Sequence, residues 1–143
     1  MGIEFSVDKK YSQFSYVGYG PHESYVDKNM SSEFGYYHSD ARSNCDTGYV
    51  RPQESGSHYA TEYLCVNGLF SLTAEHSFSF SVNPYTTEQL VKAKHGYELK
   101  DNDFVNICVD LAMRGIGASS CGVELGKQYE IPKIGKNIFT FNF

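Results

Sequence analysis

A glycine-rich segment, RGIGASSCG at residues 114–122, has the type of sequence that can bind a phosphate group through backbone amides. Its GxG start is similar to part of a dinucleotide-binding fingerprint, in which glycines let the backbone approach the pyrophosphate. Such a cradle also needs a third glycine and the N-terminus of a helix behind it. Residues 115–120 lack that third glycine, and no helix-like pattern follows them. The spacing therefore favours a plain turn over a phosphate site.

Cys121, in the same segment, has the side chain of a nucleophile. A nucleophilic cysteine needs a nearby base and a lowered pKa. The bases available in this sequence are five histidines: His22, His38, His58, His76 and His95. Because spacing alone places none of them beside Cys121, a packed thiol is the favoured interpretation.

Carboxylic acids are further candidates, because glycoside hydrolysis uses two Asp or Glu side chains that flank one bond. The acids available for such a pair are Glu23, Asp27, Glu54, Glu62 and Asp110. Most of them lie in polar stretches typical of solvated loops, and Asp110 falls within a strand pattern. Their spacing marks none of them as an acid or a nucleophile. No cluster of Cys and His has the spacing of a zinc site.

Two turn segments combine Gly and Pro with charged and hydrogen-bonding side chains. They are GPHESY (20–25) and RPQESG (51–56). Gly and Pro restrict the backbone, so the polar side chains can pair across the loops or contact a partner. Locking of the two loops by their own side chains is the favoured interpretation.

The elements that must position these residues are mostly strands. Alternation of apolar and polar residues predicts strands at 3–7, 14–20, 59–66, 69–74, 77–82, 103–113, 128–131 and 137–143. Asn67-Gly68, between two of these, is the strongest short hairpin signal. Residues 27–48 are polar and weakly periodic, which predicts a long irregular connection.

One short helix is expected near 86–95. Thr86 and Gln89 have the spacing of a capping box, and good helix formers follow, with basic residues toward the end. Together with the strands, this pattern predicts an all-β fold: an antiparallel β-sandwich with one short helix.

The composition is that of a single globular domain over residues 1–143. The chain has a formal net charge of -5, twelve Tyr, ten Phe and no Trp. Mild acidity argues against a nucleic-acid partner, and abundant Tyr and Phe favour strands. No stretch approaches the roughly 20 apolar residues of a membrane helix, and no signal peptide is evident, so we expect a cytoplasmic protein. Its four widely spaced cysteines fit free thiols: Cys45, Cys65, Cys108 and Cys121.

Four segments, in order along the chain, resemble a known family. They are YVGYGPHESYVDK (16–28), GYVRPQESGSH (48–58), FSFSVNPYTTEQLVKAKHGYEL (78–99) and VDLAMRGIGASSCG (109–122). These motifs resemble the C-terminal domain, or small chain, of glycoside hydrolase family 2 β-galactosidases. The resemblance implies a galactose-mutarotase-like supersandwich, of which this chain would be the C-terminal half. A fragment of such an enzyme would expose sheet edges, so self-association is expected.

For the complete enzyme, the resemblance implies retaining hydrolysis of terminal β-galactosides such as lactose. The catalytic glutamates of that family lie on a TIM-barrel domain, in motifs such as an Asn-Glu pair, and no Asn-Glu occurs here. We therefore expect this chain to be non-catalytic alone and to act with the remaining domains or a large subunit. The family uses magnesium and monovalent cations, and we expect no cofactor in this chain.

The resemblance also implies that this domain lends a loop to the mouth of the barrel. The corresponding loop here is 115–122, and the implied residues at the rim of the substrate pocket are Ser119, Ser120 and Cys121. Some family members carry a tryptophan at the position of Cys121, where it stacks on the sugar in the acceptor position. A thiol offers little stacking face, so weaker binding in that position is expected.

A second interpretation is a free-standing carbohydrate-binding or mutarotase-like β-sandwich. Its sugar platforms would be exposed tyrosines: Tyr16, Tyr19, Tyr25, Tyr36 and Tyr37. A mutarotase also needs a His and a Glu that act together on a bound pyranose. His22 and Glu23 are adjacent, but their spacing does not show that arrangement, so this interpretation ranks second.

Overall fold

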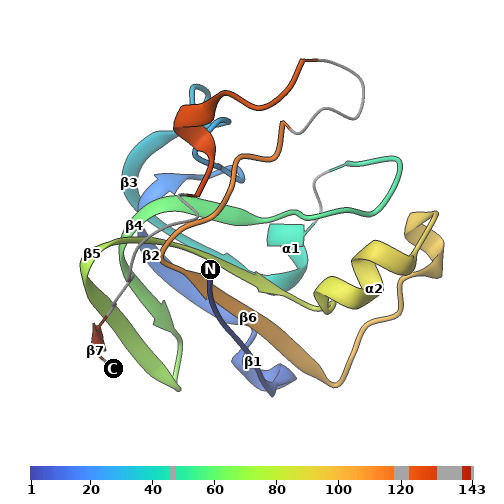
Figure 1. The fold of residues 1–143 in the computed structure, drawn as a ribbon. Helices are drawn as coiled ribbons and strands as arrows, with labels where there is room; N and C mark the ends of the chain where they lie inside the picture. The colour runs from blue at the N-terminus through green and yellow to red at the C-terminus, as the bar shows by residue number, and fades with distance from the viewer. Residues whose placement is uncertain (46–47, 118–122, 132–139, 143) are drawn as a thin grey trace.

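The computed structural model describes residues 1–45, 48–117, 123–131 and 140–142. These residues form one antiparallel sheet of seven strands (Figure 1), in the order β1-β6-β5-β4-β2-β3, with β7 paired to β5. The predicted all-β class is confirmed. The strand bounds are β1 Gly2–Asp8, β2 Gln13–Gly20, β3 Glu33–Asp40, β4 Ser57–Val66, β5 Phe70–Asn83, β6 Phe104–Asp110 and β7 Phe141–Asn142.

The hydrophobic core lies on one face of this sheet. Directly paired residues share a face, and the register pairs Leu64 with Leu72 and Phe80 with Val109. Alternate residues of each strand therefore meet in one buried cluster. Its fully buried members include Phe14, Tyr16, Leu64, Val66, Leu72, Phe78, Phe80, Val82, Val105, Ile107 and Val109.

β5 is one strand of 14 residues, where the sequence pattern predicts two. Its first half pairs with β4 and β7, and its second half pairs with β4 and β6. Glu75 and His76 separate the two predicted strands, and both side chains are exposed, as is that of Ser77, which follows them. Exposed positions of a strand accept polar side chains, so this polar stretch does not interrupt the backbone pairing.

The hairpin and the helix occur where the sequence predicts them. Asn67 and Gly68 form the turn between β4 and β5, and Gly68 has a φ of 76°. Helix α2, Thr87–Lys92, begins at the predicted capping box: the Thr86 hydroxyl accepts from the Gln89 amide, and the Gln89 side chain accepts from the Thr86 amide. The helix ends earlier than predicted, and a 3₁₀ turn follows at Gly96–Glu98.

Two further predictions of secondary structure are wrong. Residues 27–48 are not one irregular connection, because they contain β3 and a short helix, α1, at Ala41–Cys45. Among the described residues, β3 pairs with β2 alone and forms an edge of the sheet, where no apolar alternation is required. The predicted strand at 128–131 overlaps a 3₁₀ turn at Lys127–Tyr129.

The described residues contain a single sheet, so the second layer of the predicted sandwich stays a prediction. The predicted strand at 137–143 lies mostly outside the described residues, and β7 is the part that is described. Within the described ranges, none of the helices has the length and apolar character needed to cross a membrane.

Candidate functional site

The side chain of Asp27 binds two successive backbone amides of the glycine-rich segment. Ile116 N donates to Asp27 Oδ1 at 3.1 Å, and Gly117 N donates to Asp27 Oδ2 at 2.9 Å. We call this arrangement the Asp27 clamp. Figure 1 shows the two parts of the chain, the loop after β2 and the segment after β6, side by side.

Gly115 lets the clamp form. A Cβ on Gly115 would lie 2.6 Å from Asp27 Cγ and 2.9 Å from Leu125 Cδ1, closer than carbon atoms can approach. Gly117 has less restricted surroundings, because a Cβ added there would lie 3.1 Å from Asp27 Oδ2. The first glycine of the GxG pattern is therefore required by the close approach of an acidic side chain.

Two further contacts hold the start of the segment. Gly115 N donates to Tyr129 O at 3.2 Å, and Arg114 Nη2 lies 3.6 Å from Glu130 Oε1. The ion pair is exposed and contributes little to stability. The backbone at 115–117 is thus fixed from two sides, by Asp27 and by the 3₁₀ turn at Lys127–Tyr129.

The amides of the GxG segment do bind an anionic type of group, but that group is the protein's own Asp27. The prediction that residues 115–120 form no dinucleotide cradle agrees with this geometry for residues 115–117. The predicted rim residues Ser119, Ser120 and Cys121 lie outside the described residues, so the structure does not test whether Cys121 is a nucleophile.

Glu23 joins the two polar turn segments. Its Oε2 accepts from Gly56 N at 2.9 Å, and its Oε1 accepts from Lys28 Nζ and from the Tyr49 hydroxyl. Burial alone would raise the pKa of Glu23, but the hydrogen bonds from Lys28, Tyr49 and Gly56 outweigh it and lower the pKa. Glu23 therefore stays ionised and holds segment 20–25 against segment 51–56.

A second set of buried hydrogen bonds reinforces this junction. Ser24 N donates to Ser57 O at 2.7 Å, and Tyr59 N donates to the Ser24 hydroxyl at 2.9 Å. Nε2 of His58 lies 2.8 Å from Asn44 Oδ1, within hydrogen-bond distance. Burial lowers the pKa of His58 to about 4, so this histidine is neutral near pH 7. The interpretation that the two loops are locked by their own side chains is confirmed for Glu23, whose side chain accepts from the backbone of Gly56.

Glu54 lines a small pocket beside Glu4, Asp110 and Cys108. Burial first, and then the negative charges of Asp110, Glu23 and Glu4, raise the pKa of Glu54 to about 7. A general acid needs a raised pKa of this kind, but any carboxyl group that is buried among other acids also acquires one. The sequence places Glu54 among the candidate carboxylates without distinguishing it, because its burial and its acidic neighbours arise only in the fold.

Glu54→Gln should stabilise the domain at high pH. Between the usual pKa of 4.5 and about 7, the folded chain binds a proton at Glu54 more tightly than the unfolded chain does. The contribution of Glu54 to the free energy of unfolding therefore falls as the pH rises through this range. Since Gln does not ionise, the variant should gain on the order of 2 kcal/mol over the wild type between pH 4 and pH 8. Urea denaturation at both pH values measures this gain, and a pH-independent difference would contradict it.

Comparison with known proteins identifies the family. The sequence matches the family described as "Beta galactosidase small chain" over residues 1–143. The chain belongs to the β-galactosidase small-chain family. The resemblance that the four motifs indicate is therefore confirmed.

Individual β-galactosidases are similar to this small-chain domain. The β-galactosidase of Actinobacillus pleuropneumoniae is 46% identical over 130 residues, which are 91% of this chain and 13% of that protein. That of Staphylococcus xylosus is 31% identical over 91% of this chain and 13% of its own length. That of Kluyveromyces lactis is 31% identical over 100% of this chain and 14% of its own length. The small-chain domain thus spans about a seventh or less of these relatives.

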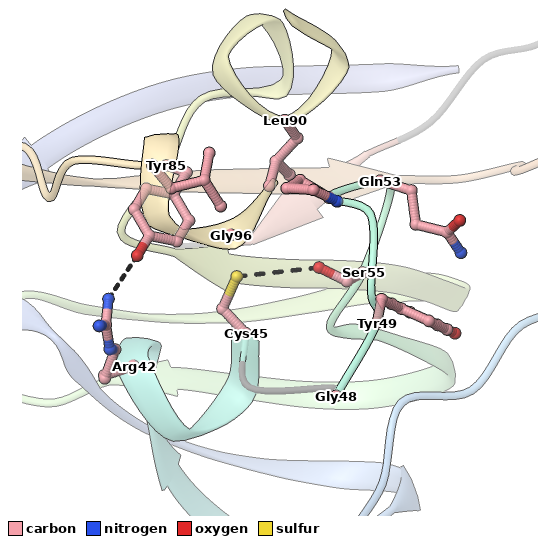
Figure 2. A pocket seen from close by; sticks show the side chains of 11 residues that line it. Arg42, Cys45, Gly48, Tyr49, Gln53, Ser55, Tyr85, Leu90 and Gly96 are labelled. Atoms are coloured by element: carbon pink, nitrogen blue, oxygen red, sulfur yellow. Dashed lines mark hydrogen bonds between the residues drawn. The ribbon is translucent and has the colours of Figure 1, made fainter. Parts of the chain in front are cut away.

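A separate pocket of about 230 Å³ lies between α1, the segment 48–55 and α2 (Figure 2). Tyr85 and Leu90 provide apolar walls, while Arg42, Gln53 and Ser55 provide polar groups. Arg42 donates to the Tyr85 hydroxyl and, at 2.7 Å, to Asp101 Oδ1. The pocket is smaller than the roughly 300–1,000 Å³ of most drug-sized ligand sites.

The prediction that five tyrosines form a row of exposed sugar platforms is wrong, because two of the five are buried. Tyr16 and Tyr25 are only 1% and 2% exposed, so neither can act as a platform for a sugar. Tyr36, on the edge strand β3, is 66% exposed. Alternate residues of a strand face opposite sides, and burial of the face that carries Tyr16 removes it from solvent.

Two observations on the described residues concern metal ligands and cysteines. There, no three His, Cys, Asp or Glu side chains come close enough to hold a metal ion. Cys65 and Cys108 carry free thiols, as the sequence predicts for them. Cys121 belongs to the part that is not described.

The sequence presents Asp27 only as one of several acids and does not show its contacts with Ile116 and Gly117. These contacts join residues 89 and 90 positions apart. The GxG pattern was the available signal, because it marks a backbone that something approaches closely. The identity of the approaching group requires the folded chain.

Proposed function

We propose that this domain is a non-catalytic part of a cytoplasmic, retaining β-galactosidase that hydrolyses terminal β-galactosides such as lactose. The observation that carries the proposal is the family match over residues 1–143, combined with coverage of only 13% of the Actinobacillus pleuropneumoniae relative. Other domains, or a large subunit, then supply the catalytic glutamates and the sites for magnesium and monovalent cations.

In this proposal the loop at 115–122 borders the substrate pocket, with Ser119, Ser120 and Cys121 at its rim. The Asp27 clamp supports the proposal, because it fixes the backbone immediately before these residues. A loop that contributes to a binding site works best when the scaffold holds its ends rigidly.

Two assays on a chromogenic aryl galactoside test the proposal. The isolated chain should show no turnover, whereas the complete enzyme that includes it should be active. Within the complete enzyme, Cys121→Trp should strengthen acceptor binding by about fivefold, the value of one aromatic stack, and should change cleavage of the aryl galactoside less. Turnover by the isolated chain, or equal effects of the substitution on both steps, would contradict the proposal.

A second candidate function, carbohydrate binding by the isolated domain, has one observation in its favour. The pocket beside α1 combines the ring of Tyr85 with the polar groups of Arg42 and Gln53. Titration of the chain with galactose and with lactose should then give a saturable signal. Gln53→Ala should weaken that signal, because it removes one of the polar groups that line the pocket. Since Gln53 is exposed, its replacement should leave the fold intact. The absence of saturation at millimolar sugar would remove this candidate.

A further inference from the structure

We propose that strand β3, Glu33–Asp40, pairs with β3 of a second copy of this chain across a two-fold axis at Tyr36. Self-association is expected from the sequence, but the sequence does not say which edge is used. In the proposed dimer the two sheets continue into one another through their β3 strands. The inference does not depend on the proposed function, because it concerns the 143-residue chain alone.

The backbone of β3 offers hydrogen-bonding groups to a further strand. Among the described residues, β3 pairs with β2 alone. Just beyond β3 and in the same register, Ala41 N donates to Ser12 O at 2.9 Å. Antiparallel strands bond at every second residue, so the odd-numbered residues of β3 bond to β2. The N–H and C=O groups of Phe34, Tyr36 and His38 therefore point away from β2, toward the open edge.

Strand β3 lacks the features that usually protect an edge from pairing. Its sequence, EFGYYHSD, contains no Lys, Arg or Pro, and its eight residues pair with β2 without a bulge. The other edge of the described sheet, β1, carries Glu4, which lines one pocket with Glu54 and Asp110. Two copies joined at β1 would bring two acidic clusters together, so β3 is the favoured edge.

The exposed side chains of β3 match one another across the proposed axis. Phe34, Tyr36 and His38 share a face and are exposed, Phe34 by 49%. With the axis at Tyr36, that residue faces its own copy, and Phe34 faces His38 of the second copy. Facing aromatic rings stabilise an antiparallel pair. Phe34 already contacts Tyr19 edge to face, with 5.6 Å between ring centroids, so it loses little freedom on pairing.

The charges of β3 also fit this register. Glu33 faces Ser39 of the second copy, and Asp40 faces Ser32, so no acid lies directly opposite another acid. An axis one residue further along the strand would instead place Phe34 opposite Asp40. The register at Tyr36 therefore joins the aromatic rings and separates the acids.

A hollow of about 560 Å³ lies beside the proposed contact. Tyr36 and His38 line it from β3, and Ser15 lines it from β2. Because Phe34 of the second copy faces His38, its ring would lie at the border of this hollow. The surface next to the axis thus has room for the incoming side chain.

Sedimentation equilibrium of the 143-residue chain over a range of concentrations tests the proposal. The wild type should show a monomer–dimer equilibrium. Tyr36→Lys should raise the Kd by about tenfold or more, because two ammonium groups would face each other where two rings meet. Tyr97→Lys is the matched control, since Tyr97 is 82% exposed and lies in the 3₁₀ turn after α2. It should leave the Kd unchanged.

Tyr36→Cys tests the register. The Cα atoms of a directly bonded antiparallel pair lie about 5.5 Å apart, which is also the usual separation in a disulfide. Mild oxidation should therefore link two copies through residue 36, which a non-reducing gel and peptide mapping detect. Tyr97→Cys, treated in the same way, should give no such link.

Three outcomes would overturn the inference. A wild-type chain that stays monomeric up to about 1 mM would leave β3 to an extended segment of another domain. A dimer that Tyr36→Lys and Tyr97→Lys weaken equally, or not at all, would show that the copies meet through another surface. A dimer in which Tyr36→Cys is not linked would contradict the axis at Tyr36.

Discussion

Replacing Gly56 with alanine should lower the free energy of unfolding by about 3 kcal/mol or more. Gly56 has a φ of 73°, and an added Cβ would lie 2.7 Å from Asn44 Nδ2 and 2.9 Å from the backbone oxygen of Asn44. The substitution thus combines a left-handed backbone with a clash against backbone that cannot easily move. Gly56 also donates to Glu23, so displacement would weaken the junction of the two turn segments. Urea denaturation of the 143-residue chain measures the loss.

Gly48→Ala is the matched control for this prediction. Gly48 has a similar φ of 70°, but an added Cβ would meet no atom of the described residues within 4 Å. Gly48→Ala should lower the free energy of unfolding by only about 1 kcal/mol, the penalty for placing alanine in a left-handed conformation. The difference between the two variants therefore isolates the close contact with Asn44. Equal losses would show that this contact relaxes without cost.

Glu23→Gln should lower the free energy of unfolding by about 2 kcal/mol near pH 7. The side chain of Glu23 is only 8% exposed, and it accepts hydrogen bonds from Lys28, Tyr49 and Gly56. Gln would present an NH₂ donor to groups that also donate, and it would leave Lys28 without its counter-charge. The loss is measured by urea denaturation.

The pH dependence of Glu23→Gln provides an independent check. The folded pKa of Glu23 lies below the usual value of 4.5, so its stabilising contribution is present above pH 4.5 and is lost as the pH falls through the folded pKa. The difference between wild type and variant should therefore shrink in acid. Glu88→Gln is the control, because Glu88 also pairs with a lysine, Lys92, but is 73% exposed. We expect no measurable loss from it, and a loss equal to that of Glu23→Gln would contradict the role of burial.

Local signals in the sequence predicted several elements correctly. Asn67-Gly68 predicts its hairpin because the turn needs a positive φ at Gly68, and Thr86 with Gln89 predicts the start of α2 because both caps lie within one turn. Alternation predicts β2 and β4, in which buried and half-buried residues alternate from Tyr16 to Gly20 and from Tyr63 to Val66. Each of these features depends on residues within a few positions of one another.

Other features could not be predicted in this way. β3 has no apolar alternation, because an edge strand is held by its backbone pairing with β2. The role of Glu23 depends on Gly56, 33 residues away, and the raised pKa of Glu54 depends on Asp110. No local pattern encodes the distance between such residues.

The segment 114–122 shows the same division. Its sequence favours a plain turn over a phosphate cradle, because residues 115–120 lack the third glycine of the fingerprint and no helix-like pattern follows them. The four motifs that include it were sufficient to indicate the family. Only the folded chain shows that Gly115 makes room for Asp27 and that Ile116 and Gly117 bind it. Amino-acid order determines which backbone conformations are possible, whereas packing of distant strands determines which side chain reaches a given amide.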